Sequence, residues 1–386
     1  MKTIETSRHF DLWRDPVSGI ETYVLKGETA PFHQTIYFVA ASTTKDGRYF
    51  WFYCAFPPLL GSEGSEKSMA VLDLYTDEIY YHPDIQPAGT PMVDQDSGEL
   101  YWPTANYIFK KGPHPKDAVT KIAKIPSDMR RLGGRVASHM TFSPDKSEIF
   151  CDVSSGNYTF LSTVNVKTGI FSVWHKSFGG WNHAQINPVD GDLALYAMDF
   201  WVNISTSIRN PIGRDEENKI TRLWTIRRGE DPVHHKAMFE QASHEYWSAN
   251  GKRIYYCDKD RGTCSVDIET GERKLVHPEG YRHSYMTADE KYCCADIFLY
   301  DEEGQWYRGC PTRVNFHNTV TGKTVDIVTE NPALYKKSEP CVYHIDPHPR
   351  FVFNDEYVAF TTTVHGRVDV AFTKVSQLIK ATGGEG

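Results

Sequence analysis

The chain has 386 residues, of which 40 % are hydrophobic, 13 % aromatic and 24 % charged. This composition is that of a globular protein and excludes a disordered chain, a collagen-like fibre and a coiled coil. Lysine and arginine number 42 against 50 aspartates and glutamates, giving a net charge of −8, and no Lys/Arg block is present. We therefore expect no nucleic-acid or anionic-membrane partner. A small acidic ligand remains compatible with this net charge, because such a ligand responds to local charge.

The N-terminal residues 1–10 lack the apolar segment of a signal peptide. No apolar run approaches the roughly 20 residues of a membrane-spanning helix. The eight cysteines form no CxxC pair, so we expect buried, reduced thiols. Together these features predict a cytoplasmic protein.

One turn pattern recurs along the chain. A segment of apolar or small residues precedes a turn that contains Asp or Asn, and a segment in which apolar residues alternate follows the turn. The turn residues are Asp46, Asp96, Asp145, Asp190, Asn250, Asp289 and Asp355. A repeat of about 50 residues is typical of a propeller blade with four short strands. Seven turns therefore predict an all-β, seven-bladed β-propeller.

A second hairpin pattern, often with Thr-Gly at the turn, falls where the outer two strands of a blade belong. It covers residues 71–80, 164–173, 266–275 and 314–325. The segment 19–25 is expected to complete the last blade, whose other strands end near Phe372, because this closure removes an exposed sheet edge. Residues 200–221 lack the pattern and predict an insertion in blade four. We predict one domain over residues 1–386, with a helix only in the tail near 375–381.

Histidines recur at one register, six or seven residues before a turn. They are His139, His183, His244, His283 and His348, while His33 lies upstream of a similar position in blade one. The strand that leads into the turn is the innermost one, so equivalent positions should converge on the axis at one mouth. Gathered imidazoles suit a metal site or acid–base catalysis. The alternative is that each histidine packs against a neighbouring blade.

Blade seven adds a denser cluster in residues 343–350. His344, Asp346 and His348 lie among two prolines, which suits a divalent cation, and the alternative is a Pro-rich turn between blades. Arg222 begins a strand just after the insertion, where a surface or inter-blade ion pair is the alternative to a substrate contact. Strand alternation is expected to place Tyr246 on the same face as His244. It directs Glu245 away from that face.

The ordered set of motifs resembles oligogalacturonate lyases. Residues 243–251 resemble their Thr-His-Glu-Phe-Trp…Asp-Gly segment, and residues 282–289 are similar to their Ser-His-Leu-Met…Asp-Gly segment. Residues 346–351 and 363–366 resemble their His-Pro-His-Pro…Phe and Val-His-Gly, residues 222–224 their Arg-Met-Trp, and residues 182–183 their Gly-His. The match is good in blades three to seven, whereas blades one and two follow only from the repeat.

The resemblance implies a seven-bladed propeller that binds a divalent metal, usually manganese, and cleaves oligogalacturonates by β-elimination. It implies His283 and His348 as metal ligands, His244 as the base and Arg222 as the group that binds the substrate carboxylate. The chain departs from the family's Gln-x-x-His-Pro-His, with Tyr343 at the Gln position and Asp346 at the first His position. The departures leave open whether the metal is kept, whether His344 or Asp346 is the third ligand, and which uronate is cleaved.

Uronate chemistry explains these residue types. The C5 proton is only weakly acidic, so neutralising the C6 carboxylate with a metal or Arg stabilises the charge that develops when the proton leaves. A neutral histidine can take that proton. We predict metal-assisted β-elimination of short uronic-acid oligosaccharides to a 4,5-unsaturated uronate. The candidate residues are His244, Arg222 and Tyr246 for catalysis, His139, His183 and Arg222 for substrate binding, and His283, His344 and His348 for the metal.

Three other functions stay open on the sequence. One is a lyase for a different uronate, such as a glucuronate-containing oligosaccharide. A hydrolase or epimerase is another, although hydrolysis needs paired carboxylates and the ring positions carry histidines. The third is a non-catalytic propeller that binds a sugar or a partner, because propellers host many functions.

Overall fold

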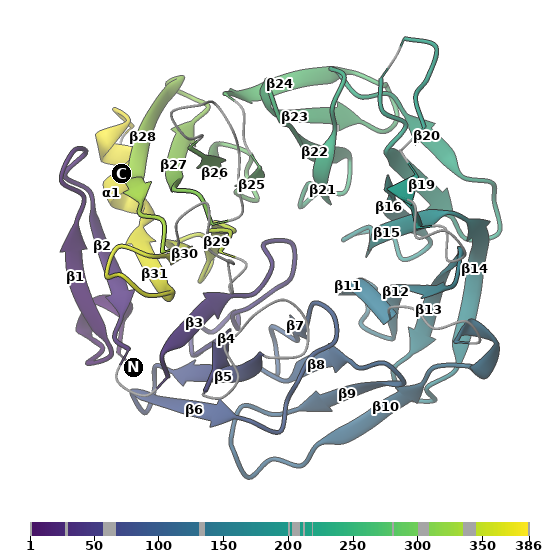
Figure 1. Cartoon of the computed structure of the whole chain (residues 1–386), viewed down its shortest axis with the longest axis horizontal. Coiled ribbons are helices and arrows are strands. Elements are labelled where there is room, and N and C mark those ends of the chain that lie inside the picture. Colours follow the sequence, from purple (N-terminus) through teal and green to yellow (C-terminus); the bar gives the residue numbers. More distant parts are fainter. Residues whose placement is uncertain are drawn as a thin grey trace.

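Seven β-sheets surround a central channel in the computed structural model of the chain (Figure 1). The structure describes residues 2–27, 30–56, 67–130, 136–199, 201–202, 209–210, 213–217, 219–279, 282–299, 309–334 and 345–384. The innermost strand of each sheet faces the channel, and the later strands lie progressively further out (Figure 1). The all-β, seven-bladed fold predicted from the turns is confirmed.

The first three blades follow one another in chain order. Blade one contains β3 (Phe32–Thr35), β4 (Tyr49–Ala55), β5 (Ser68–Asp73) and β6 (Glu78–His82). Blade two contains β7 (Met92–Val93), β8 (Leu100–Pro103), β9 (Tyr107–Lys111) and β10 (Thr120–Lys124). Blade three contains β11 (Val136–Phe142), β12 (Glu148–Ser155), β13 (Tyr158–Asn165) and β14 (Phe171–Phe178). Two short 3-10 helices, Ile4–Thr6 and Ser127–Met129, lie outside these sheets.

Blades four to six repeat this order. Blade four contains β15 (Gly180–Ile186), β16 (Leu193–Asp199), β19 (Leu223–Arg227) and β20 (Val233–His235). Blade five contains β21 (Ser243–Trp247), β22 (Arg253–Asp258), β23 (Gly262–Asp267) and β24 (Arg273–Pro278). Blade six contains β25 (His283–Met286), β26 (Tyr292–Phe298), β27 (Thr312–Asn318) and β28 (Lys323–Asn331). Within the predicted insertion, β17 (Trp201–Val202) and β18 (Arg209–Asn210) form a separate two-stranded sheet.

Both ends of the chain build blade seven. The C-terminal strands β29 (Arg350–Val352), β30 (Tyr357–Thr362) and β31 (Asp369–Lys374) are followed outward by β2 (Glu21–Leu25) and β1 (Phe10–Arg14). The pairing of β2 with β31 confirms the predicted closure, and β1 is a fifth strand that the sequence pattern did not reveal. The tail forms α1 (Val375–Ala381), as expected. No helix of the described chain is long and apolar enough to cross a membrane.

Local chemistry explains the repeating turns. All seven predicted turn residues lie between the first and second strands of their blades. Asp and Asn suit this position because their side chains accept backbone N–H groups two residues on. The Oδ1 atoms of Asp46 and Asp145 each accept such a bond at 3.0 Å, from the N–H groups of Arg48 and Ser147. Hydrogen bonds within each turn therefore stabilise it, and the turn joins the first strand of its blade to the second.

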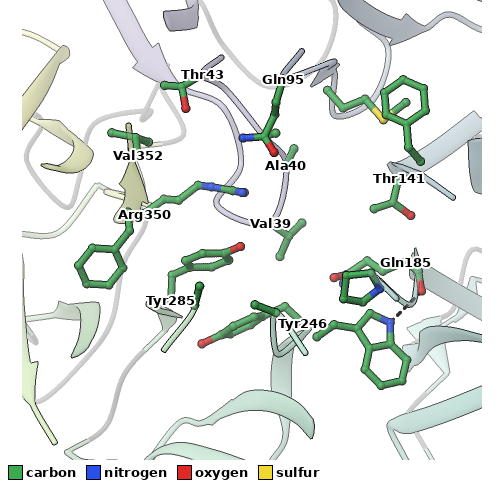
Figure 2. A pocket seen from close by; sticks show the side chains of 18 of the residues that line it. Val39, Ala40, Thr43, Gln95, Thr141, Gln185, Tyr246, Tyr285, Arg350 and Val352 are labelled. Atoms are coloured by element: carbon green, nitrogen blue, oxygen red, sulfur yellow. Dashed lines mark hydrogen bonds between the residues drawn. The ribbon is translucent and has the colours of Figure 1, made fainter. Parts of the chain in front are cut away.

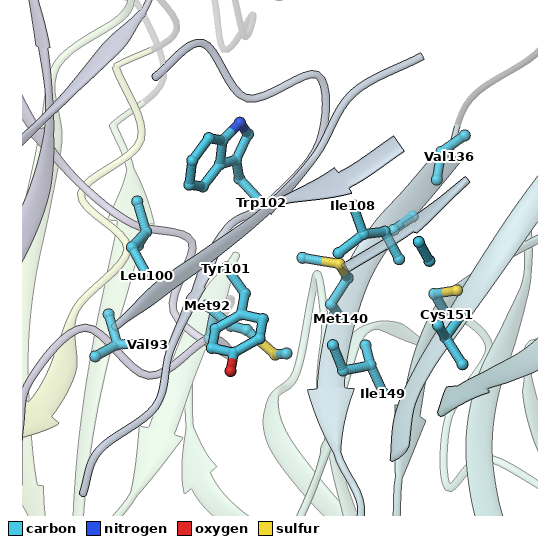
Figure 3. Close-up of a cluster of buried hydrophobic side chains, with 14 of the residues drawn as sticks. Met92, Val93, Leu100, Tyr101, Trp102, Ile108, Val136, Met140, Ile149 and Cys151 are labelled. Atoms are coloured by element: carbon cyan, nitrogen blue, oxygen red, sulfur yellow. The ribbon is translucent and has the colours of Figure 1, made fainter. Parts of the chain in front are cut away.

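Apolar side chains fill the spaces between adjacent blades. The cluster between blades two and three contains Met92, Leu100 and Trp102 on one side and Ile149 and Cys151 on the other (Figure 3). All seven cysteines in the described part of the chain are buried and unpaired by disulfides, as expected for reduced thiols. Apolar clusters between the blades thus hold the inner strands in place, and the cluster between blades two and three also extends into blade one through Trp51 and Val71.

We expect Phe372→Ala to destabilise the ring strongly. The fully buried Phe372 ring lies 5.4 Å from that of Phe10 on β1 and 4.8 Å from that of Phe50 on β4, so it joins both chain ends to blade one. Loss of such a core ring costs about 3–5 kcal/mol. Urea unfolding followed by circular dichroism should show this decrease in unfolding free energy. Leu12→Ala, at a side chain that is 56 % exposed on β1, is the control and should change it by less than about 0.5 kcal/mol.

An equally small effect at both positions would contradict the role of this closure. The same curves test whether residues 1–386 unfold as one domain, which stays a prediction and requires a single transition.

Candidate active site

Irregular backbone at the start of the inner strands aims the histidines into the channel. The pairing register shifts between Asn182 and Gln185 on β15 and between Ser243 and Tyr246 on β21. His183 and His244 lie at these two register shifts and have φ angles of 56° and 55°. His348 has a φ angle of 47°. Left-handed backbone at a non-glycine residue costs about 1 kcal/mol or more and recurs at functional sites. A β-bulge re-aims the side chain, which is its effect at His183 and His244.

The five histidines of the predicted ring converge at one mouth of the channel and line a cavity of about 620 Å³. The ring centroids of His139 and His183 lie 4.6 Å apart, and His283 lies 4.3 Å from both His244 and His348. His33 is not among them, since it is buried on β3 with its Nδ1 atom 3.5 Å from Asp369 Oδ1.

Tyr37 occupies the place that blade one leaves without a histidine. The segment after β3 turns into the channel (Figure 1), and the Tyr37 ring centroid lies 4.7 Å from that of His139 and 4.8 Å from that of His348. Burial, and then the neighbouring Glu245 carboxylate, raise the pKa of Tyr37 well above its ordinary value, so the phenol keeps its proton. Tyr37 was not among the predicted site residues, because the predicted ring consisted of histidines, although this segment precedes the first turn as the other histidine segments precede theirs.

Arg222, at the start of β19, is fixed by a buried carboxylate. Its Nε atom donates to Glu245 Oε2 at 2.7 Å, and its Nη1 atom lies 3.5 Å from Asp199 Oδ1. Burial raises the pKa of Glu245, but Arg222 and His183 outweigh burial and hold that pKa well below its ordinary value. The carboxylate is therefore ionised and can only accept hydrogen bonds. The Nδ1 atom of His183 lies 2.9 Å from Glu245 Oε1 and 3.2 Å from Arg222 Nη2, so the three side chains form one cluster.

The protonation of His244 follows from its neighbour. Ser243 Oγ donates its one hydrogen to the carbonyl oxygen of Cys257 at 3.1 Å, so it accepts from His244 Nδ1 at 3.0 Å. The proton of the neutral imidazole therefore lies on Nδ1, and Nε2 keeps its lone pair. Burial, followed by the charges of His283 and Arg222, lowers the pKa of His244 well below its ordinary value. His244 is thus a neutral group that can accept a proton.

His283, Asp346 and His348 form a group that could hold a metal ion. One ligand atom from each lies within 4.8 Å of the others. The buried Asp296 carboxylate orients two of them, because it contacts His283 Nδ1 at 2.9 Å and accepts the backbone N–H of His348 at 3.1 Å. A carboxylate behind a ligating histidine fixes the ring and leaves Nε2 for the metal. Two imidazoles and one carboxylate fit a divalent ion such as manganese.

Two of the expected residues need separate comment. His344 lies outside the described residues, so its role as a ligand stays a prediction, whereas Asp346, the alternative ligand, belongs to the possible metal group. Tyr246 lines a different cavity, of about 770 Å³, at the opposite mouth, where it is stacked with Tyr285 (Figure 2). Strict alternation was the wrong premise, because the bulge at His244 turns Glu245 into the site and Tyr246 out of it.

Comparison with known proteins gives one match among curated sequences. No protein-family profile matches the chain. A curated oligogalacturonate lyase from Dickeya dadantii (strain 3937) is 28 % identical over 173 residues, and the match spans 40 % of this chain and 43 % of that protein.

Two solved structures share the whole fold. An oligogalacturonate lyase in complex with manganese has a TM-score of 0.73 at 18 % identity, and the oligogalacturonate lyase from Vibrio parahaemolyticus has a TM-score of 0.74 at 16 % identity. Each comparison covers 95 % of this chain and 96 % of the other. These findings confirm the resemblance to oligogalacturonate lyases that the motifs indicated.

We expect Asp346→Ala to weaken Mn²⁺ binding at least tenfold, because it removes the one carboxylate of the group. Titration of the purified protein with Mn²⁺, followed by electron paramagnetic resonance, measures the affinity without any reaction. His139→Ala is the matched control, since it removes a ring histidine that is not part of the group, and it should leave the affinity unchanged. A loss for His344→Ala with none for Asp346→Ala would overturn this assignment.

Proposed function

We propose that this chain is a lyase that cleaves short uronic-acid oligosaccharides, of the oligogalacturonate type, by β-elimination. One observation carries the proposal: a neutral His244 shares its cavity with Arg222 and with the possible metal group of His283, Asp346 and His348. A base beside groups that bind a carboxylate is what proton abstraction next to a carboxylate requires. The names of the relatives support the same substrate class.

His244 takes the proton in this mechanism. Its Nε2 atom accepts the C5 proton, the C5–H electron pair forms the C4–C5 double bond, and the C4–O bond breaks with its electrons on oxygen. Ser243 keeps the imidazole in the required tautomer through the contact at Nδ1. The product is a 4,5-unsaturated uronate and a shortened oligosaccharide.

The substrate carboxylate is proposed to bind Arg222 and the possible metal group, which share the cavity with His244. Arg222 is held by Glu245 and Asp199, so it contributes fixed N–H donors rather than an uncompensated charge. His283, Asp346 and His348 would hold a divalent cation, which supplies charge neutralisation of the carboxylate when bound. His139 and His183 line the same cavity and are proposed to contact the sugar hydroxyl groups.

Tyr37 replaces Tyr246 as the candidate proton donor to the leaving oxygen. Its phenol lies among the histidines of the cavity, whereas Tyr246 is buried against Phe38 and Tyr255 beside the opposite mouth. A phenol is protonated near neutral pH and can donate to an alkoxide that forms beside it. The catalytic cycle is complete when solvent carries the proton from His244 back to Tyr37.

Purified protein should produce ultraviolet absorbance from the unsaturated product when mixed with di- or trigalacturonate. EDTA should abolish the increase and Mn²⁺ restore it. His244→Ala should lower kcat by about 10²–10⁴-fold, the usual contribution of a general base, without changing the circular dichroism spectrum. No absorbance increase with galacturonates would refute the substrate, and glucuronate-containing oligosaccharides would be the next to test. Failure with both would leave a sugar-binding propeller.

Tyr37→Phe should lower kcat by about 10²-fold or more, because it removes only the proton donor and keeps the ring that packs against the histidines. Tyr246→Phe is the matched control and should leave kcat unchanged. Steady-state kinetics with trigalacturonate compares the two. A loss in Tyr246→Phe with none in Tyr37→Phe would reverse the assignment.

A further inference from the structure

A second cavity, of about 770 Å³, opens at the mouth of the channel opposite the histidines (Figure 2). The proposed function does not use this cavity, and the fully buried Phe38 lies between it and the histidine cavity. Its volume falls within the range of about 300–1,000 Å³ that is usual for sites that bind small molecules. The polar groups that point into it therefore indicate which kind of molecule it accepts.

Arg350 points into this cavity from the start of β29 (Figure 2). Its guanidinium lies 4.6 Å from the centroid of the Tyr285 ring, which is stacked on Tyr246, and Tyr246 is stacked on Tyr255. The Nη1 atom of Arg350 also donates to the Phe38 carbonyl oxygen at 2.6 Å. The guanidinium is thus held in one position before a ligand binds, which lowers the entropic cost of binding.

The other N–H groups of Arg350 are available to a ligand. Its Nε and Nη2 atoms make no hydrogen bond or ion pair with any residue that the structure describes. These two atoms form one edge of the guanidinium, and such an edge matches the two oxygens of a carboxylate. The side-chain amide of Gln95, which extends toward the guanidinium in Figure 2, likewise has no hydrogen-bond partner within the described chain. Only solvent or a ligand can satisfy these donors.

The two lysines that line the cavity are already paired. Lys45 Nζ lies 2.9 Å from Asp96 Oδ1, and Lys146 contacts both Asp94 and Asp96. Neither lysine therefore competes with Arg350 for an anion.

Two carboxylates also line the cavity, and neither forms an ion pair with Arg350. Glu290 accepts a hydrogen bond from Asn250 Nδ2 at 3.3 Å, and Asp355 accepts the backbone N–H of Ala288 at 3.3 Å. Both offset the positive charge of Arg350 over longer distances. The cavity therefore holds no general excess of positive charge that would collect polyanions, and it suits a single carboxylate bound directly by the Arg350 edge.

Apolar side chains form much of the remaining wall. Val39 and Val352 belong to it (Figure 2), as do the three methionines Met92, Met140 and Met286. Methionine side chains adapt to partners of different shape. A ligand with an apolar body beside its carboxylate therefore matches both parts of the wall.

We propose that this cavity binds a small organic monocarboxylate with an apolar body, and that Arg350 holds the carboxylate through Nε and Nη2. Gln95 adds a donor to the same carboxylate, and the valines and methionines contact the apolar body. The site is separate from the histidine cavity, so the inference holds whether or not the chain is a lyase.

Isothermal titration calorimetry with benzoate tests this site. Benzamide is the comparison ligand, because it has the same ring and nearly the same shape but no charge. EDTA is present throughout, so that no metal ion binds the carboxylate. Arg350→Met removes the guanidinium and keeps an apolar chain. Arg228→Met is the matched control, since Arg228 also lies over an aromatic ring, that of Trp174 at 4.5 Å, but outside this cavity.

Benzoate should bind with a dissociation constant of about 1 mM or lower, and about tenfold more tightly than benzamide, the lower end for a hydrogen bond to a charged group. Arg350→Met should remove this preference by weakening benzoate alone, and Arg228→Met should keep it. Arg350→Lys should keep only part of it, because an ammonium retains the charge but lacks the edge with two donors.

Three results would overturn the proposal. One is no binding of benzoate, or of hexanoate with its flexible body, at about 10 mM. Another is equal affinity for benzoate and benzamide, and the third is a preference that survives Arg350→Met.

Arg282→Gln tests where benzoate binds, because it removes a cation from the histidine cavity and should leave the affinity for benzoate unchanged. A loss in Arg282→Gln with none in Arg350→Met would place benzoate among the histidines and so refute the second site.

Discussion

The left-handed backbone at the start of the inner strands is the constraint on which the site depends. His183, His244 and His348 all have positive φ angles, and two of them lie in β-bulges. Regular strands would send alternate residues to opposite faces. The bulge at His244 instead brings Glu245 into the same site, and the ring of blade cores supplies the packing that keeps this unfavourable backbone in place.

Two buried carboxylates hold site residues of neighbouring blades in fixed positions. Glu245 of blade five fixes Arg222 and His183 of blade four, and Asp296 of blade six fixes His283 of its own blade and His348 of blade seven. Each carboxylate accepts several hydrogen bonds, which offsets the cost of burying its charge. Arg222 and the possible metal group are therefore positioned by contacts between neighbouring blades, and the closed ring sets the distance between them.

The channel has two chemically different mouths, separated by one short segment. Tyr37 faces the histidine cavity, Phe38 is buried between the mouths, and Val39 lines the opposite cavity (Figure 2). Arg350 donates from Nη1 to the Phe38 carbonyl oxygen and lies over the Tyr285 ring at the second mouth. The segment after β3 of blade one thus lies inside the channel between the two cavities. It contributes an aromatic side chain where other blades contribute imidazoles.

The sequence was sufficient to predict the seven blades, the turn between the first two strands of each, the closing strand β2 and the convergence of five histidines. These features follow from local turn chemistry and from a repeat, which place equivalent residues at equivalent positions. Only the folded structure shows that Glu245 contacts Arg222 and His183 and that Tyr37, rather than Tyr246, lines the histidine cavity. The reason is physical: a β-bulge breaks alternation without a sequence signal, and contacts between blades depend on how the ring closes rather than on spacing along the chain.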